Sequence, residues 1–457
     1  MLGRSESSSW ELDCVENNTR SSIPKVLILS HNPLSKNQSN GKTIYSMLKY
    51  IPKENLAQVY LTTDIPDFEL CNNYFQIDDF DILRKLIYRK EFGRIIKSKD
   101  ISEQIHFKEK VRNSLILNII RHTKGPLFNI FRDSLWMIIG YREKLLRQFI
   151  MDFNPDILFF QSSGNVFSFR IAQWIIRVFK LGLIMETTDD YLGKKLTINP
   201  LFWILNNRLN AEYRMISKRA SMIIVISEEM KREYSKKFYS NYYVAMNSVK
   251  IENRLIDYRE EHCDSLRILF SGNIELNRWK TILLLSKTIE KIEFIKIELD
   301  IYTLSNISRY VKSKFARMKK TRFHKAVDAE KLVDIRDNSD IMLHVESFDF
   351  RSRYITRFSI STKISEYLAS GKPILAIGPA NVESIRYLKR EKVAEVVTYP
   401  SEKDIENSIR RLMSAGHRIE LGQKGIVLAH ENHNIERVAC DISNAINDAT
   451  SIIINAK

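Results

Sequence analysis

Short apolar runs alternate with amphipathic segments along most of the first half of the chain. Such runs are typical of strands that are buried on both faces of a parallel sheet. The segments between them carry apolar side chains at helical spacing, and they predict the helices that cross from strand to strand. The runs lie at 25–30, 59–61, 157–160, 183–185, 222–226 and 243–246. This alternation predicts a doubly wound α/β domain.

The same alternation begins again after residues 248–265, which are polar, charged and without periodicity. This stretch predicts an interdomain linker. Further apolar runs follow at 267–271, 299–302, 341–345, 373–377 and 395–397. We therefore predict two tandem Rossmann-like α/β domains, at 24–247 and 266–433, preceded by a flexible leader at 1–23 and followed by a C-terminal helix at 434–457.

One basic and aromatic segment, residues 83–149, interrupts the alternation and has a helical pattern. Its basic side chains have no comparable acidic cluster; they are Arg84, Lys85, Arg89, Lys90, Arg94, Lys97 and Lys99. A basic amphipathic element of this kind can lie on an anionic membrane. It can equally be a helical insertion that packs on its own domain and keeps a solvated basic rim. The sequence leaves both interpretations open.

Length and composition agree with two globular domains. A single core rarely grows beyond about 250–300 residues, and this chain has 457 residues, of which 44% are hydrophobic and 28% charged. The net charge of +16 favours an anionic partner, namely nucleic acid, acidic lipid or a phosphate-bearing substrate. Charge alone does not choose among these three.

Cysteine usage and the N-terminus indicate a cytoplasmic protein. The four cysteines form no Cys-x-x-Cys pair, so neither a zinc site nor a redox motif is indicated, and a reducing compartment fits best. No apolar run approaches the roughly 18 residues that span a bilayer. The leader lacks the apolar stretch of a signal peptide.

The segment from Arg357 to Pro373 carries the most chemical information. Ser359 or Ser361 can cap a helix that begins there, and Gly371 followed by Pro373 ends it.

The N-terminus of this helix is a natural anion site, formed by Ser361, Thr362 and Lys363. Glu366 lies on the same face as Lys363, where its carboxylate can accept hydrogen bonds from a ribose diol. A surface helix with an ordinary Lys–Glu pair explains the same spacing.

The segment resembles the donor-binding helix of family-4 glycosyltransferases of the GT-B fold, especially those that build bacterial surface or capsular polysaccharides. In that family a glutamate before an Ala-x-Gly-x-Pro ending holds the nucleotide ribose, and Glu366 matches it. Residues 271–279 resemble the first turn of the family's C-terminal domain. Gly272 and Asn273 lie there beside the donor, and Arg278, six positions after Gly272, matches the basic residue that grips the diphosphate. Residues 220–234 and 339–346 are similar to further family strands.

The resemblance implies a specific architecture and reaction. The two domains would face a central cleft that holds the active site, with the acceptor on the N-terminal domain and the nucleotide-diphosphate sugar on the C-terminal one. Transfer would retain the anomeric configuration without a metal or other cofactor. Arg278, Lys363 and helix N-termini would then stabilise the charge on the leaving diphosphate. The acceptor would be a glycan or lipid-linked, and the protein could contact the anionic inner face of the cell membrane peripherally.

Three residues of the N-terminal domain are further candidates. Gly41 should let the backbone approach the donor phosphates and the acceptor closely. Asp189 and Asp190 follow a predicted strand end, where ligands collect in open α/β sheets, and either could orient the acceptor hydroxyl. Helix capping or a turn would also explain the two acids.

The chain departs from the family at three positions. Phe358 stands where the family has its first glutamate, Asn273 stands where an arginine is usual, and Gln161 stands where many members have a histidine. Glu346 is the candidate to replace the missing acid. The departures keep open a non-catalytic sugar-nucleotide-binding subunit of a glycosyltransferase pair. A sugar-nucleotide epimerase of the same fold and, from charge alone, a nucleic-acid-binding protein are further alternatives.

Other motif-like features carry less weight. Residues 40–43 lack the first glycine of a P-loop, because that position is Lys36. The Asp-Phe-Asp sequence at 79–81 has the form of a metal-binding motif of the other large glycosyltransferase fold, but no nucleotide-binding context surrounds it. We interpret His31 and His344 as structural.

Overall fold

A computed structural model describes residues 23–36, 39–88, 93–98, 126–139, 141, 143–193, 199–251 and 265–455. The predicted leader, most of the predicted linker and the middle of the basic segment lie outside the described residues. The chain divides into two compact units. The first unit comprises Met1–Ala245 and Ile435–Lys457, and the second comprises Met246–Asn434.

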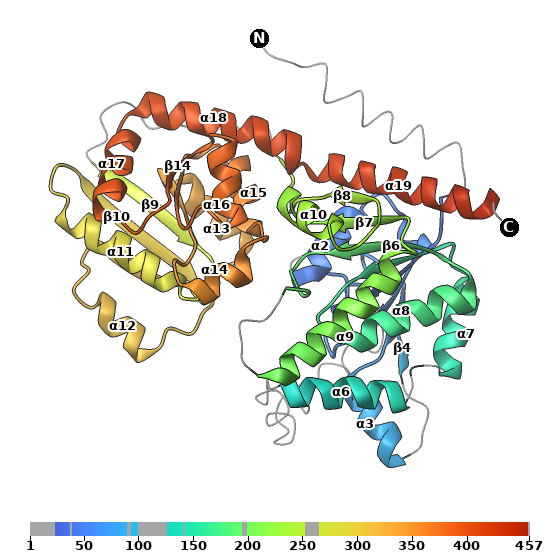
Figure 1. The fold of residues 1–457 in the computed structure, drawn as a ribbon. Coiled ribbons are helices and arrows are strands. Elements are labelled where there is room, and N and C mark those ends of the chain that lie inside the picture. The colour runs from blue at the N-terminus through green and yellow to red at the C-terminus, as the bar shows by residue number, and fades with distance from the viewer. Residues whose placement is uncertain are drawn as a thin grey trace, which may run out of the picture. The chain divides into compact units, whose positions relative to one another are not determined.

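The first unit is built on an eight-stranded sheet with the order β4-β3-β2-β1-β5-β6-β7-β8 (Figure 1). All neighbouring strands are parallel except β4, which pairs antiparallel with β3. The central strands are fully buried because helices cover both faces of the sheet, which is why they read as continuous apolar runs. The strands are β1 Val26–Ser30, β2 Leu56–Tyr60, β3 Asn73–Gln76, β4 Arg94–Ile96, β5 Ile157–Gln161, β6 Gly182–Thr187, β7 Met222–Val225 and β8 Tyr242–Val244.

The final helix of the chain belongs to the first unit. α19 packs against α2 and against β5 and β6, and it places Ile442 and Ile446 in the same core as Ile44 and Met47 of α2. The Tyr243 hydroxyl donates to Asp441 over 2.6 Å. The helices of this unit are α2 Ser39–Met47, the 3-10 helix Lys53–Asn55, α3 Asp79–Tyr88, α6 Pro126–Ile139, α7 Lys144–Phe153, α8 Val166–Phe179, α9 Pro200–Ser217, α10 Glu228–Ser235 and α19 Ile435–Asn455.

The second unit is built on a six-stranded parallel sheet with the order β11-β10-β9-β12-β13-β14. The side chains of β9 alternate between its two faces, so that Leu266, Ile268 and Phe270 enter one core. The strands are β9 Ser265–Ser271, β10 Lys296–Thr303, β11 Thr321–Lys325, β12 Ile341–Val345, β13 Ile374–Ile377 and β14 Ala394–Val397.

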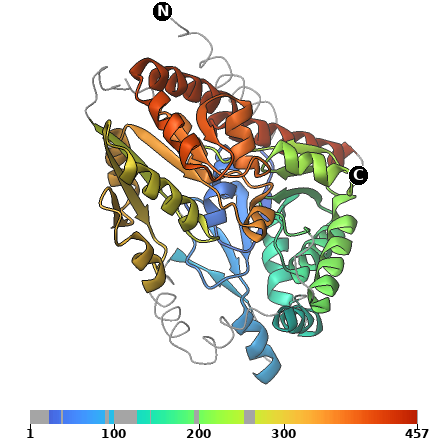
Figure 2. The same ribbon diagram turned by 60° about the vertical axis from the view of Figure 1, so that its left-hand side comes forward.

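Helices cover both faces of this second sheet (Figure 2). α11 and α17 contact each other and supply Ile282, Leu285, Ile405 and Ile409 to one core, whereas α15 and α18 pack together elsewhere. The helices are α11 Arg278–Lys291, α12 Arg309–Phe315, α13 Ala329–Asp337, α14 Phe350–Thr356, α15 Thr362–Ala369, α16 Glu383–Arg390, α17 Glu402–Leu412 and α18 Ala415–Asn432.

The two tandem Rossmann-like sheets confirm the predicted fold class, but one local prediction was wrong. The described part of residues 83–149 is not wholly helical, because β4 adds an edge strand through Arg94–Ile96. Gly41 lies inside α2, which begins at Ser39. No helix in the described ranges is both long and apolar enough to cross a membrane.

Candidate functional site

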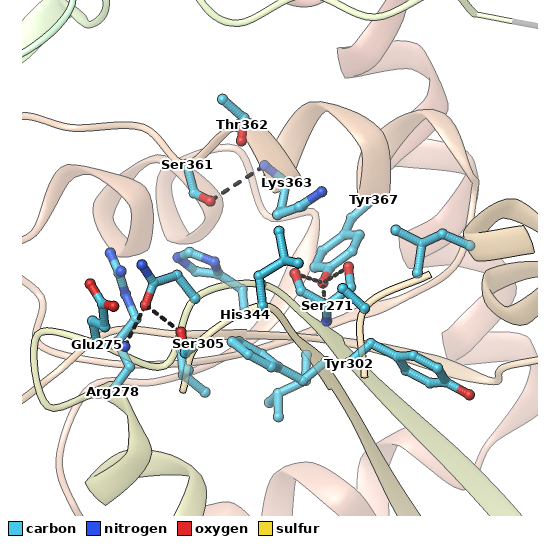
Figure 3. A pocket seen from close by; sticks show the side chains of 18 of the residues that line it. Ser271, Glu275, Arg278, Tyr302, Ser305, His344, Ser361, Thr362, Lys363 and Tyr367 are labelled. Atoms are coloured by element: carbon cyan, nitrogen blue, oxygen red, sulfur yellow. Dashed lines mark hydrogen bonds between the residues drawn. The ribbon is translucent and has the colours of Figure 1, made fainter. Parts of the chain in front are cut away.

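A cavity of about 620 Å³ lies at the carboxyl ends of β9, β10, β11 and β12 in the second unit (Figure 3). β9 pairs with β10 on one side and with β12 on the other, so the winding of the sheet reverses at this strand. Open α/β sheets bind ligands outside such a switch point, because the loops on either side turn away from each other there. The topology therefore accounts for the position of the cavity.

Arg278 enters the cavity from the first residue of α11. Its guanidinium donates to both carboxylate oxygens of Glu346, from Nε over 3.2 Å and from the second nitrogen over 3.1 Å. Glu346 follows β12, and its backbone carbonyl accepts from the hydroxyl of Thr281 over 2.8 Å. The bidentate pair holds one planar cation in a fixed orientation at the cavity wall.

Burial shifts the pKa values of Glu346 and His344, which lie beside this cation. It raises the pKa of Glu346, while Arg278 acts in the opposite direction. Burial, assisted by the charge of Arg278, lowers the pKa of His344 to about 3, so its imidazole is neutral at pH 7. The His344 Nε2 atom is buried and accepts or donates no hydrogen bond within the described part of the chain.

The N-terminus of α15 lies on the other side of the cavity from Arg278 (Figure 3). Ser361 caps the helix, as predicted, by accepting from the backbone amide of Lys363 over 3.3 Å. One turn later the Tyr367 hydroxyl contacts the Ser271 backbone amide and side chain, each over 3.1 Å. This buried tyrosine ties α15 to the end of β9, so the two walls of the cavity are held together.

The loop between β9 and α11 has an uncommon backbone. Leu276 and Asn277 are both left-handed, with φ of 53° and 60°. Such residues are strained unless surrounding contacts hold them, and they often occur at ligand sites. Asn273 supplies contacts of this kind, because its side-chain oxygen accepts from the Glu275 amide over 2.5 Å and from the Ser305 hydroxyl over 3.0 Å.

The structure thus brings together most of the donor-site residues predicted from sequence. Those that line the cavity are Gly272, Asn273, Arg278, Ser361, Thr362 and Lys363. Glu366 is not among the described lining residues. Its carboxylate lies 3.2 Å from the Lys363 ammonium and 3.9 Å from the Arg336 guanidinium.

The predicted candidates Gly41, Asp189 and Asp190 belong to the first unit. Asp190 accepts from the Gly193 amide over 3.0 Å and from the Tyr234 hydroxyl over 2.8 Å, which is the turn-forming role that the sequence left open. Asp189 accepts from the Tyr191 hydroxyl over 3.2 Å, and burial raises its pKa. Both acids are therefore engaged by local structure through at least one carboxylate oxygen each.

Gly41 allows a close approach of two backbone segments. A β-carbon at this position would lie 2.1 Å from the carbonyl oxygen of Pro33, so the β1–α2 loop would have to move.

We expect Gly41→Ala to destabilise the protein by about 1–3 kcal/mol, as for other overpacked sites. Gly416→Ala is the matched control: its β-carbon meets only Ser414 Oγ at 3.9 Å, and alanine there should be neutral or stabilising by about 0.4–1 kcal/mol. Chemical denaturation of both variants tests this; equal stabilities would contradict it.

Sequence reasoning missed a buried acid in the first unit. Glu186 is the second-to-last residue of β6, and its register partner is Gln161 of β5. Burial raises the pKa of Glu186 to about 8, and its Oε2 atom is without a hydrogen-bond partner among the described residues. The available signal was an acid directly after three apolar strand residues, Leu183, Ile184 and Met185.

Comparison with known proteins identifies the fold. No protein-family profile and no curated protein sequence matches the chain. Among solved structures, a glycosyltransferase from Rickettsia africae is similar with a TM-score of 0.57 at 12% identity, over 95% of this chain and 100% of that one. TarM is similar with a TM-score of 0.60 at 9% identity, over 93% and 99%. HepE of Anabaena, in complex with UDP and glucose, is similar with a TM-score of 0.58 at 9% identity, over 93% and 100%.

These likenesses define the class of fold. Two Rossmann-like units, each with a parallel sheet, are arranged along the chain as in GT-B glycosyltransferases, and the matches cover nearly the whole length of both partners. The chain therefore has the GT-B fold. At these identities the likeness concerns the fold, and activity has to be argued from the site.

Proposed function

We propose that the protein is a glycosyltransferase whose second unit binds a nucleoside-diphosphate sugar. The observation that carries this proposal is the cavity at the switch point of the second sheet, which is lined by Arg278 on one side and by Lys363 and the N-terminus of α15 on the other. A leaving nucleoside diphosphate gains negative charge as the glycosidic bond breaks. Two cations and a helix N-terminus that are already oriented stabilise this charge at little reorganisation cost.

The rest of the cavity wall suits the other parts of such a donor. Leu304, Val327 and Leu332 provide an apolar surface for a base near the ends of β10 and β11. We assign the ribose to Glu366, whose carboxylate reaches the Lys363 side chain and would have to turn from it towards the ligand.

Glu346 is our candidate for the acid that contacts the donor sugar. Phe358 occupies the usual position of that acid. The Arg357 guanidinium lies over the Phe358 ring, 4.4 Å from the centre of that ring. Glu346 instead lines the cavity next to Arg278. We propose that it takes over the missing contact.

The finer parts of the proposal come from the family-4 resemblance. They are retention of the anomeric configuration, charge stabilisation without a metal, and a glycan or lipid-linked acceptor in surface polysaccharide synthesis. A cytoplasmic location at the inner face of the membrane belongs to the same proposal. One similar solved structure, WaaG, is a glycosyltransferase involved in lipopolysaccharide biosynthesis, with a TM-score of 0.54 at 9% identity over 94% of this chain and 99% of that one.

A thermal-shift panel tests the donor site. Wild type and Glu366→Ala would be scanned with uridine, guanosine, thymidine and adenosine diphosphates and their sugars. One nucleotide family should stabilise the wild type by about 2.7 kcal/mol at roughly 100 times its dissociation constant, and Glu366→Ala should lose most of this gain. Glu420→Ala is the matched control, because Glu420 forms a comparable but exposed ion pair with Lys424 in the same unit.

Two results would change the proposal. If no nucleotide raises the melting temperature of the wild type while DNA or RNA does, the assignment of the donor site is wrong. The net charge then indicates a nucleic-acid-binding protein. If the nucleotide binds but the donor sugar is never transferred to any glycan or lipid-linked acceptor, a binding subunit of a glycosyltransferase pair is the better interpretation.

A further inference from the structure

The first unit contains a second cavity, of about 210 Å³, at the carboxyl ends of β1, β2 and β3. It is bordered by His31 after β1, by Thr62 and Thr63 after β2, and by α3 and α6, which contact each other (Figure 1). Pockets for drug-sized ligands span about 300–1,000 Å³. The smaller volume here suits a single ring.

A fixed carboxylate provides the polar wall. Asp79 accepts two hydrogen bonds on Oδ1, each over 2.8 Å, from the Arg132 guanidinium and from the Trp136 indole. Its Oδ2 atom accepts none from the described residues, and the side chain is 40% exposed. His31 adds a ring whose buried Nδ1 has no partner within the described ranges.

Aromatic side chains provide the apolar part of the lining. Phe128 and Phe131 of α6 border the cavity together with Trp136. Trp136 is held in place by stacking on Phe167, with ring centres 4.2 Å apart and planes inclined by 10°. Phe131 is 58% exposed, so its ring is accessible at the border of the cavity. An accessible ring in this place offers an apolar face to a ligand.

The charges of the lining residues argue against an anionic ligand. Two carboxylates, Asp78 and Asp79, line the cavity, and each is already paired: Asp78 with Arg94 over 3.0 Å and Asp79 with Arg132 over 2.8 Å. Arg132 is the guanidinium among the lining residues, so a phosphate would have to break its existing pair with Asp79. A neutral ring with hydroxyl groups on its edge and C–H groups on its face matches both walls, because carboxylates accept from hydroxyls and aromatic rings pack against apolar faces.

We propose that this cavity binds one neutral pyranose ring, with its face on Phe131 and a hydroxyl group on Asp79 Oδ2. Its role as the site of the acceptor sugar rests on the function proposed above, whereas the binding itself does not. The acceptor would then present a neutral sugar, rather than a phosphate, to this part of the first unit.

Ligand-observed saturation-transfer NMR tests the binding without any donor. The probes are the methyl glycosides of glucose, galactose, mannose and N-acetylglucosamine at millimolar concentration, with 1-hexanol as a purely apolar probe. At least one glycoside should bind. Phe131→Ala should weaken it by about two- to tenfold through lost ring contact, and Asp79→Asn by about tenfold through the lost charged acceptor.

Controls keep the outcome interpretable. Asp79→Asn retains an oxygen for Arg132 and Trp136, and Tyr239→Ala removes an aromatic ring that is 91% exposed elsewhere in the same unit. The proposal is overturned if no glycoside binds, if the Asp79 and Phe131 variants bind like Tyr239→Ala, or if only 1-hexanol binds. Such a failure leaves the nucleotide thermal shift unchanged, so it is distinct from failure of the proposed donor site.

Discussion

Replacing Arg278 with alanine is expected to lower the kcat of sugar transfer by a factor of about 10²–10³. This is the usual loss when one oriented group that stabilises developing negative charge is removed. Arg278 is suited to that role because Glu346 accepts two hydrogen bonds from one edge of its guanidinium and because only 19% of its side chain is exposed. Initial rates with the donor found by the thermal-shift panel provide the measurement.

Lys280→Ala is the matched control for Arg278→Ala. Lys280 is on the same helix, two residues further on, and pairs with Asp349 over 2.9 Å, but both side chains are substantially exposed. Exposed pairs contribute little, so its kcat should remain within about a factor of two of wild type. Arg278→Lys should recover only part of the rate, since an ammonium cannot reproduce the two parallel hydrogen bonds. Equal losses in the Arg278 and Lys280 variants would contradict the assignment.

The stabilities of the two units are expected to change with pH in opposite directions. In the second unit, burial lowers the pKa of His344 to about 3 and that of His433 to about 4. The unfolded chain binds these protons below pH 6.5 and the folded unit does not, so stability is lost as the pH falls from 6.5. Within this window each histidine lowers the free energy of unfolding by about 1.4 kcal/mol for every pH unit of acidification.

The first unit is expected to lose stability as the pH rises. Burial raises the pKa of Glu186 to about 8, and those of Asp78 and Asp133 to about 6. The folded unit keeps these protons at pH values where the unfolded chain has released them. Between pH 6 and 8 Glu186 dominates, and the free energy of unfolding should fall by roughly 2 kcal/mol.

Urea-dependent oxidation of buried methionines by hydrogen peroxide separates the two units. Met185 lies beside Glu186 in the first unit and Met342 lies in β12 of the second, and both are fully buried. From pH 6 to 8 the urea midpoint for Met185 should fall and that for Met342 should stay constant; from pH 6.5 to 4.5 the midpoint for Met342 should fall. Glu186→Gln should remove the pH dependence of the Met185 urea midpoint above pH 6. A Met185 midpoint that does not fall, or a Glu186→Gln variant that keeps the slope, would show that this carboxyl is not the cause.

The central strands and the donor helix could be predicted because their signals are local. Apolar runs are buried in any compact fold of the chain, so they could be recognised from the sequence. The strands predicted in this way are β1, β5, β7, β9, β12 and β13. The cap at Ser361 and the end at Gly371, whose φ is 66°, are set by residues within one helix.

The less central elements were missed because tertiary contacts decide them. β11, Thr321–Lys325, has partly polar, half-exposed residues and is a strand because it pairs with β10 at the edge of the sheet. β4 pairs antiparallel with β3 in a segment with a helical pattern. Edge strands bury only part of their side chains, so their sequences carry a weak alternation.

By itself, the sequence determined two tandem Rossmann-like units and the helix with Ser361, Thr362 and Lys363 at its N-terminus, because hydrophobic periodicity and helix caps act over a few residues. The candidates Arg278 and Glu366 came from the family resemblance. Only the tertiary structure decided that Glu346 holds Arg278 from a position 68 residues away in the chain. It alone brought Tyr367 against Ser271, packed α19 on the first unit, and placed Phe131 and Asp79 in the lining of one cavity. These pairings join distant segments through strand order and core packing, which no local pattern encodes.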